Sequence, residues 1–307
     1  MQLPERMSSI SPPATLRCFQ PSGTTGIWAY YDGRTCPWHS SNWYDETLAL
    51  GVATYAIVSG ESALLFDAGL TPAHAEFMLA HVRSLGAKDI TTVYSHYHSD
   101  HIAGASSLKD TKIVAHLKTK KKLVEEADNL RNPATDEGPS IEVVLPAETY
   151  EKCKTLQIGS VKVELHNFNI HTEDSTLLFL PDSGLVFAGD MLEDTVTYMS
   201  EPENLETHIQ ELGRMSKLSI KKILPAHGSP ERIETGGFYI SFIDATTRYL
   251  RALNEPVETP VAWTKKLRDV VHEDIISGNL IYCEAYEGVH KENIESMKEL
   301  REESESK

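Results

Sequence analysis

Residues 94–101 read Y-S-H-Y-H-S-D-H, which places three histidines and one aspartate within six positions of one another. Imidazole nitrogens and a carboxylate oxygen at this spacing can converge on one or two metal ions. Zinc suits this donor set, and iron or manganese is also possible. Without a metal, such close imidazoles would repel each other on protonation. The fold therefore has to bring further metal ligands to this loop.

The sequence around the cluster alternates short apolar runs with longer helical ones, which is typical of sheets layered with helices. The clearest period-two alternation is Val161, Val163 and Leu165, with polar residues between them. Two similar β-rich halves flanked by helices are expected, followed by a largely helical stretch over residues 232–288. Strands are predicted at 52–60, 62–69, 90–95, 112–116, 150–158, 160–168, 175–181, 185–189 and 221–226, and helices at 72–85, 117–130 and 204–218.

The net charge and the cysteine spacing indicate which binding partners and which cellular location to expect. The 29 basic and 45 acidic residues give a formal net charge of −16, which disfavours nucleic acid and anionic membranes. The one basic run, at residues 118–122, is followed by two glutamates and reads as a solvated helix face. The four cysteines are far apart, and no apolar stretch resembles a signal peptide or a membrane span. We expect a cytoplasmic protein that acts on a small molecule, and a homodimer is possible.

Further candidate ligands stand at the ends of predicted strands. His171 follows the strand over 160–168, Asp190 ends the run LVFAGD, and His227 follows the strand over 221–226. Asp67 also ends an apolar strand, where a buried carboxylate could orient the ligand imidazoles. His166 competes with His171, but its polar place on a half-buried strand favours a structural role.

Together these residues resemble the five ordered motifs of the metallo-β-lactamase fold hydrolases: Asp67, His96-x-His98-x-Asp100-His101, His171, Asp190 and His227. The resemblance spans residues 52–228 and implies an α/β fold, a four-layer αββα sandwich with a helical C-terminal extension. It departs from the family at His171, where G-H-T-x-G is usual and this chain has I-H-T-E-D-S. It implies two zinc ions per chain, the first held by His96, His98 and His171, the second by Asp100, His101 and His227, with Asp190 bridging them.

The same resemblance divides the chain. Residues 1–25 are expected to be a loose arm, 26–231 the metallo-β-lactamase domain, and 232–290 a helical part of that domain. Residues 291–307 read as a frayed charged helix or a disordered tail.

Two cations beside one water would lower its pKa from 15.7 toward about 7, which produces a metal-bound hydroxide. Attack of this hydroxide on a carbonyl, with Asp100 relaying the proton, fits ring opening of a small lactam or lactone. The chain is similar to stand-alone members of the fold, some of which open lactams such as benzoxazolinone, an aromatic cyclic carbamate. We therefore predict a dinuclear zinc hydrolase of the lactamase or lactonase type.

Three alternatives remain at this stage. The first is a glyoxalase II-like thioesterase, for which Arg248, Tyr249 and Arg251 could contact glutathione, although they could equally form a helix surface. The second is an iron-dependent persulfide dioxygenase, which uses one metal. The third is a metal-binding protein without turnover.

Aromatic residues supply the candidate substrate contacts. Trp28, Trp38 and Trp43 cluster before the first motif, where they either pack in the core or suit a flat apolar substrate. Many lactonases of the family carry a tyrosine three residues after the bridging aspartate, but this chain has Glu193 there. Tyr198 is the candidate to replace that tyrosine.

Overall fold

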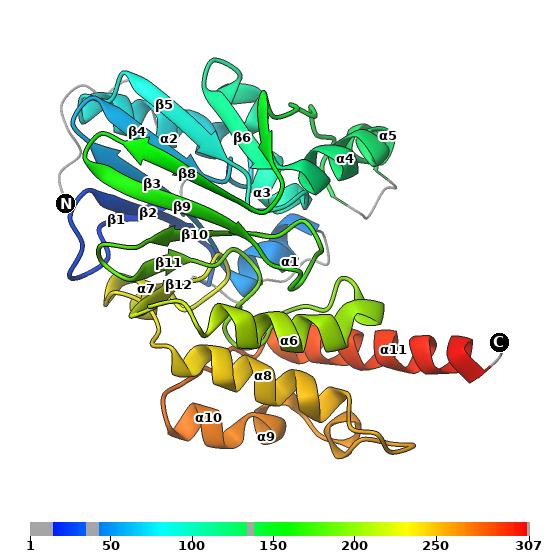
Figure 1. Ribbon diagram of the computed structural model, residues 1–307. Helices are drawn as coiled ribbons and strands as arrows, with labels where there is room; N and C mark the ends of the chain where they lie inside the picture. The colour runs from blue at the N-terminus through cyan, green and yellow to red at the C-terminus, as the bar shows by residue number, and fades with distance from the viewer. Residues whose placement is uncertain (1–14, 35–42, 134–137, 306–307) are drawn as a thin grey trace.

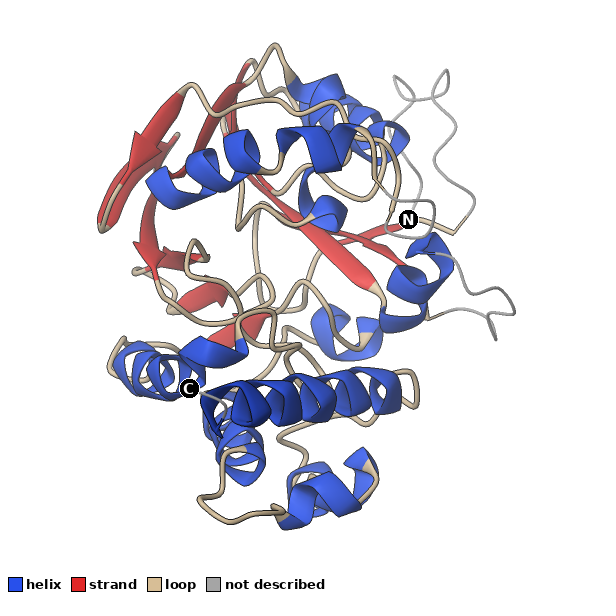
Figure 2. Cartoon of the chain, turned by 90° about the vertical axis from the view of Figure 1, so that its right-hand side faces the viewer, coloured by secondary structure: helices blue, strands red, loops and turns tan. Residues whose placement is uncertain are grey.

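Two facing β-sheets with helices on their outer sides form the protein. The computed structural model describes residues 15–34, 43–133 and 138–305. The first sheet has the strand order β1-β2-β3-β4-β5-β6-β7 and the second the order β12-β11-β10-β9-β8. α2 packs against the outer face of the first sheet. In Figure 1, α4 and α5 lie at the upper right beside β6, and α6, α8 and α11 lie below the sheets; Figure 2 shows the helices and strands from the side. The predicted four-layer αββα sandwich with a helical C-terminal extension is confirmed.

The elements have the following bounds. The first sheet contains β1 (Arg17–Phe19), β2 (Ile27–Asp32), β3 (Val52–Ser59), β4 (Ser62–Phe66), β5 (Asp89–Val93), β6 (Lys112–His116) and β7 (Glu148–Tyr150). The second contains β8 (Cys153–Ile158), β9 (Val161–Asn167), β10 (Thr176–Leu180), β11 (Leu185–Phe187) and β12 (Lys222–Leu224). The longer helices are α1 (Trp43–Leu50), α2 (Pro72–Ser84), α4 (Leu117–Glu125), α6 (Leu205–Met215), α8 (Ser241–Leu253) and α11 (Tyr286–Glu305). Shorter helices are α3 (Ser99–Ile102), α5 (Ala127–Arg131), α7 (Pro230–Glu234), α9 (Leu267–Val270), α10 (His272–Ile276) and the 3-10 turns η2 (Ala105–Leu108), η3 (Pro202–Asn204) and η4 (Val261–Thr264).

Strands covered on both faces explain the continuous apolar runs of the sequence. In β10, Leu178 packs into the core between the two sheets, while Leu177 and Phe179 pack into the core beneath α6 and α8. In β4, Leu64 faces the core between the sheets and Leu65 faces the core beneath α2. Each fully buried leucine contributes roughly 1.5–3 kcal/mol relative to an exposed one. Burial on both sides of the sheets therefore fixes the sandwich.

Two sequence expectations about strands are wrong. Residues 1–25 were expected to be a loose arm. Residues 1–14 lie outside the described residues, but Cys18 of β1 pairs with Tyr30 of β2 at the edge of the first sheet. Residues 150–158 were expected to form one strand, but the chain crosses between the sheets there, so Tyr150 ends β7 and β8 begins at Cys153. An apolar pattern records burial and not which sheet a strand joins, so it could not reveal this crossing.

The helical C-terminus is longer than expected. α11 continues through the segment expected as a frayed helix or tail, because Asn293, Ile294 and Met297 are buried against the second sheet's helical layer. The helix predicted over 117–130 is interrupted, since α4 ends at Glu125 and α5 begins at Ala127. None of the described helices combines the length and the apolar character that crossing a membrane requires.

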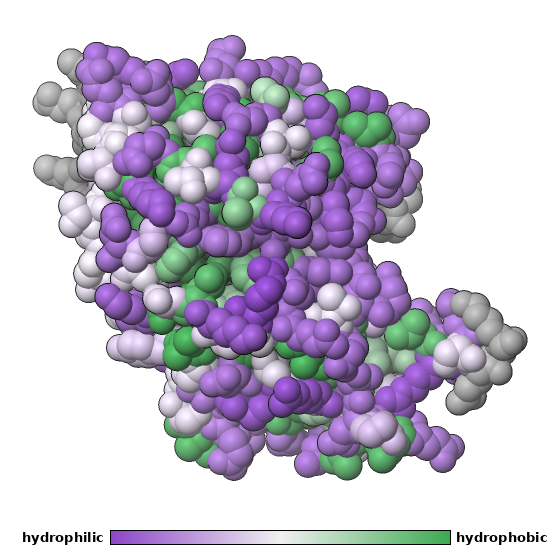
Figure 3. All heavy atoms as spheres, viewed as in Figure 1, coloured by the Kyte–Doolittle hydropathy of each residue, from purple (hydrophilic) through white to green (hydrophobic). Residues whose placement is uncertain are grey.

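Parallel pairing places several strand ends at one edge of the sandwich. β4 pairs in parallel with β5, and β11 pairs in parallel with β12. The loops that follow these four strands contain Asp67 and every candidate ligand except His171, which follows β9. The carboxyl ends of parallel strands meet at one edge of a sheet. On the face seen in Figure 3, hydrophilic residues predominate and apolar ones are scattered between them, so this face is ordinary solvent-exposed surface.

Candidate metal centre

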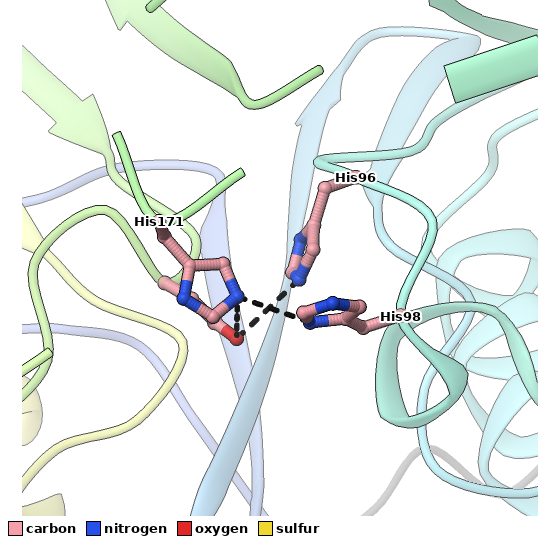
Figure 4. Close-up of side chains that lie close together, drawn as sticks. His96, His98 and His171 are labelled. Carbon is pink, nitrogen blue, oxygen red and sulfur yellow. Dashed lines mark hydrogen bonds and ion pairs between the residues drawn. The ribbon is translucent and has the colours of Figure 1, made fainter. Parts of the chain in front are cut away.

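Three histidines and one aspartate converge in a first cluster. Figure 4 shows His96, His98 and His171 directed toward one another, from the loops that follow β5 and β9. His171 Nε2 lies 3.0 Å from His98 Nδ1 and 3.7 Å from Asp190 Oδ2. His96 Nε2 lies 3.5 Å from the same aspartate oxygen. The four ligand atoms lie within 4.8 Å of one another, which is compact enough to share one metal ion.

A second cluster lies beside the first. Its members are Asp100, His101, His227 and again Asp190, with ligand atoms within 4.8 Å of one another. His101 Nε2 is 3.0 Å from Asp190 Oδ2, and His227 Nε2 is 3.1 Å from Asp100 Oδ2. Asp190 is the one residue common to both groups, so the structure brings together all seven ligands that the sequence predicted.

The donor set fits zinc. Five imidazole nitrogens and two carboxylates suit this ion, which takes nitrogen and oxygen ligands readily. Two buried atoms, His96 Nε2 and Asp190 Oδ1, have no hydrogen-bond partner among the described residues. A buried polar atom without a partner costs about 1–3 kcal/mol, and a coordinated cation would remove that cost. The residues therefore fit a pair of metal ions that shares Asp190.

The opposite nitrogen of each imidazole is held by another group, which fixes the ring. Asp67 Oδ2 lies 2.9 Å from His101 Nδ1, and its Oδ1 accepts a hydrogen bond from the Ser95 amide at 2.6 Å. Backbone carbonyl oxygens hold two further rings. His171 Nδ1 donates a hydrogen bond to the Tyr198 carbonyl at 2.8 Å, and His227 Nδ1 donates one to the Gly51 carbonyl at 2.7 Å.

His96 and His98 complete this pattern. His96 Nδ1 lies 2.9 Å from Ser95 Oγ, so its Nε2 faces the cluster. His98 is turned the other way, since its Nε2 lies 3.3 Å from Ser200 Oγ and its Nδ1 faces His171. Partners on the far nitrogen set which nitrogen is free to bind a metal.

Burial and neighbouring charges shift the pKa values of these groups in opposite directions. Burial lowers the pKa of His98 to about 3, so this imidazole is neutral at physiological pH. Burial opposes ionisation of Asp190, but His101 and His227 outweigh it and hold the Asp190 pKa well below its ordinary value. Burial also disfavours the charged form of His101, yet Asp190 and Asp100 hold the His101 pKa well above its ordinary value. Carboxylates are thus ionised and ready to accept cations in place of protons.

Local backbone conformation delivers two of these side chains. Asp67 and His171 have positive φ angles of 74° and 69°, which residues other than glycine seldom adopt. Gly189, at a φ of 54°, precedes Asp190, and an added Cβ there would lie 3.1 Å from the Ser95 side chain. Strained or tightly packed backbone of this kind gathers at functional sites, where the surrounding structure holds it in place.

A cavity of about 480 Å³ opens beside both clusters. His98, Asp100, His171, Asp190 and His227 line it on one side. The loop after β11 adds Glu193 and Tyr198, while α1 and the start of α11 supply the remaining wall. The wall residues of the two helices are Trp43, Glu46, Thr47, Ala49, Leu50, Gly288, Val289 and Glu292, and Ala285 lines the cavity just before α11.

The predicted aromatic contacts separate into two groups. Trp43 and Tyr198 line the cavity. Trp28 lies elsewhere, since its ring packs edge-on against His81 of α2 at 4.6 Å, beneath the outer helical layer. Trp38 lies outside the described residues. Tyr31, from the same aromatic segment, donates a hydrogen bond to the Gly228 carbonyl at 2.8 Å and so anchors the loop that carries His227.

Other candidates from the sequence have structural roles. His166 contacts Glu164 on the outer face of β9, away from the clusters. Arg248 pairs with Asp274, and the buried Tyr249 hydroxyl contacts His290, so neither residue lines the cavity.

Sequence reasoning missed part of the site. Glu193 was noted only as the wrong residue for a lactonase tyrosine, but its Oε2 accepts a hydrogen bond from Tyr286 of α11 at 3.1 Å and its Oε1 one from the Tyr198 amide at 2.9 Å. Burial raises the pKa of Glu193 to about 7. Its place three residues after Asp190 was the one available signal. The wall residues of α1 and α11 carry no motif.

Comparisons with known proteins agree with this geometry. The family model described as "Metallo-beta-lactamase superfamily" matches residues 48–227. No curated protein matches the sequence.

Three of the solved structures that match are all distant in sequence. A metallo-beta-lactamase from Pontibacter korlensis has a TM-score of 0.58 and 19% identity, over 77% of this chain and 99% of its own. DIM-1 metallo-beta-lactamase exposed to ceftazidime has a TM-score of 0.56 and 18% identity, over 77% of this chain and 96% of its own. VMB-1 at pH 5.5 has a TM-score of 0.56 and 17% identity, over 76% of this chain and 96% of its own. At these identities the likeness concerns the fold alone.

Proposed function

The chain belongs to the metallo-beta-lactamase superfamily, and on that premise we propose that it is a dinuclear zinc hydrolase that opens the ring of a small lactam or lactone. The single observation that carries the proposal is the pair of ligand clusters that share Asp190. A bridging carboxylate with three further ligands on each side is the donor set of a two-metal site. The first ion would be held by His96, His98 and His171, the second by Asp100, His101 and His227.

When bound, the two ions would supply a nucleophilic water at neutral pH and would polarise a carbonyl oxygen. Asp100 contributes the proton transfer. It lines the cavity, its side chain is 16% exposed, and its pKa is held well below the ordinary value by His101 despite burial. An ionised carboxylate there can accept a proton from the attacking water and pass it to the departing ring nitrogen or oxygen.

The ring bond between the carbonyl carbon and that nitrogen or oxygen breaks, while the water oxygen bonds to the carbon. The product then carries a new carboxylate and a free amine or hydroxyl. The chain's own groups hold the reactants for this step: Asp67 fixes the His101 ring, and Tyr198 and Trp43 enclose the substrate end of the cavity.

The size and lining of the cavity support a small cyclic substrate. About 480 Å³ suits a compact ring, and the aromatic Trp43 suits a flat one such as an aromatic cyclic carbamate. The thioesterase alternative has less support, because Arg248 and Tyr249 do not reach the cavity.

A hydrolysis panel tests the proposal. Zinc-reconstituted protein should open at least one lactone or lactam, including benzoxazolinone, faster than it cleaves S-lactoylglutathione, and a chelator should abolish the activity. Asp100→Asn should lower kcat by about a hundredfold or more while circular dichroism stays unchanged. Asp110→Asn, the same change in an exposed turn before β6, is the matched control. Oxygen uptake with a persulfide by iron-loaded protein, together with no ring opening, would contradict the proposal.

A further inference from the structure

Two helices that carry no metal ligand form one wall of the cavity, and both place a glutamate on it. Glu46 belongs to α1 and Glu292 to α11, and both line the cavity together with Trp43. The two helices lie far apart in the sequence, so no local pattern pairs these residues. This shared wall would contact the part of a bound substrate that is remote from the metal ligands.

Neither glutamate has a direct hydrogen-bond or ion-pair partner in the part of the chain that the structure describes. Glu46 and Glu292 are exposed, and neither makes a hydrogen bond or an ion pair with another described residue. Partial desolvation and the charge of Glu46 raise the pKa of Glu292, and Lys291 lowers it in part, so the two carboxylates lie within electrostatic reach of each other. Two like charges without a direct partner among the described residues create a negative potential at this wall.

No described residue that lines the cavity is lysine or arginine. Two basic side chains have partners outside the cavity. Lys291, beside Glu292 in the sequence, lies 3.8 Å from Glu295, although its charge also lowers the pKa of Glu292. The half-buried Arg34 donates to the Leu50 carbonyl at 2.6 Å beneath Tyr286. The two internal segments outside the described residues, 35–42 and 134–137, contain no lysine or arginine in the sequence.

We propose that Glu46 and Glu292 make this cavity select cationic and neutral substrates over anionic ones. The inference rests on the proposed function, whose substrate class it narrows. Arginine or lysine best replaces the lost hydration of an anionic group, and this cavity wall offers carboxylates instead. An ammonium group would be attracted by both glutamates and by the ring of Trp43, which can act as a cation–π partner.

A matched set of lactones tests this selection by changing only the charge. N-β-alanyl-, N-butyryl- and N-succinyl-homoserine lactone have side chains of similar length that end in an ammonium, a methyl and a carboxylate group. On zinc-loaded protein we expect kcat/KM to fall in that order, with about a tenfold difference between the first and the last, since two charges act across a partly solvated cavity. Raising the salt concentration should reduce the difference.

Substitutions of the two glutamates test whether they cause this order of kcat/KM values. Glu292→Gln and Glu46→Gln should each reduce the preference for the ammonium over the carboxylate by about threefold, and the double variant should nearly remove it. Glu299→Gln removes the same charge from an exposed position on α11 outside the cavity, so it should keep the preference of the unaltered protein. The proposal is overturned if the succinyl lactone is the best substrate or equals the others. It is also overturned if the glutamine variants keep the full preference.

Binding of inert analogues separates this inference from the proposed hydrolysis. The corresponding N-acyl cyclopentylamines have no bond to cleave, and their binding to zinc-loaded protein can be ranked by ligand-observed NMR. If no lactone is opened but the ammonium analogue binds best and Glu292→Gln removes that preference, the hydrolase proposal fails and the charge selection stands. If lactones are opened but the analogues bind without regard to charge, the charge selection fails alone.

Discussion

The two halves of the sandwich contribute to the metal centre in different ways. The first sheet's half supplies four of the seven candidate ligands from one loop and the short helix α3, within residues 96–101. The second half supplies three ligands from three separate loops, at His171, Asp190 and His227. A local cluster can be recognised in a sequence, whereas the dispersed ligands are brought together only when the second sheet packs onto the first.

The halves also hold their ligands differently. In the first half, the carboxylate of Asp67 orients His101. In the second, backbone carbonyls of Tyr198 and Gly51 orient His171 and His227. A side-chain substitution can therefore disturb ligand orientation in the first half, while in the second half the fold itself has to change. The predictions below use this contrast.

The largest effect is expected at Asp190, the one ligand that both clusters share. Asp190→Asn keeps the shape but removes the charge, so the protein should retain less than half of its zinc after dialysis. Hydrolysis should fall by about a thousandfold or more, because both ions lose a ligand. Elemental analysis and kcat measurements check this. Asp182→Asn, in the exposed turn between β10 and β11, is the control, and full zinc retention in Asp190→Asn would contradict the shared site.

A smaller effect on zinc content and activity is expected when a single variant removes one candidate ligand that belongs to only one of the two clusters. His98→Ala and His227→Ala should each release about one zinc per chain and lower activity by about a hundredfold. The two variants should lose different ions, which cobalt substitution and absorption spectra can distinguish. Loss of both ions in either variant would mean that the clusters do not bind independently.

Asp67 tests orientation in the first half without removing a ligand. Asp67→Asn keeps a hydrogen-bonding oxygen but removes the negative charge beside His101, so zinc affinity should fall by about tenfold to a hundredfold. Competition with a chromophoric chelator measures the change. His166→Asn, on the outer face of β9, removes an imidazole outside the clusters and should leave affinity unaltered.

The smallest effect concerns stability in the loop that delivers His171. The carboxyl group of Asp174 is buried, and burial raises its pKa from 3.8 to about 6 despite the nearby hydroxyl groups of Thr172 and Thr119. Its folded-state pKa is the higher one, so the native state is favoured below the ordinary pKa and loses stability as the pH rises through 6. Asp174→Asn should therefore be more stable than the unaltered protein above pH 7, by about 1–2 kcal/mol.

Thermal unfolding of the zinc-loaded proteins at pH 5 and pH 8 checks this sign. The stability difference should be larger at pH 8. An equal difference at both values would show that Asp174 does not titrate in this range.

The contrast between the halves also explains what the sequence could predict. The loop at residues 96–101 and the strand ends at Asp67, Asp190 and His227 were recognisable, because chemistry-bearing residues followed apolar runs. The β1 strand and the crossing between β7 and β8 were not, because strand pairing is set by packing partners far along the chain. Glu46 and Glu292 lie on helices with no motif, and only the folded structure places them on the same cavity wall.

The most direct test of the central claim is anomalous diffraction at the zinc edge from crystals of the zinc-loaded protein. Two peaks are predicted: one among His96, His98 and His171, the other among Asp100, His101 and His227, with Asp190 in contact with both. A single peak, or peaks remote from Asp190, would contradict the account.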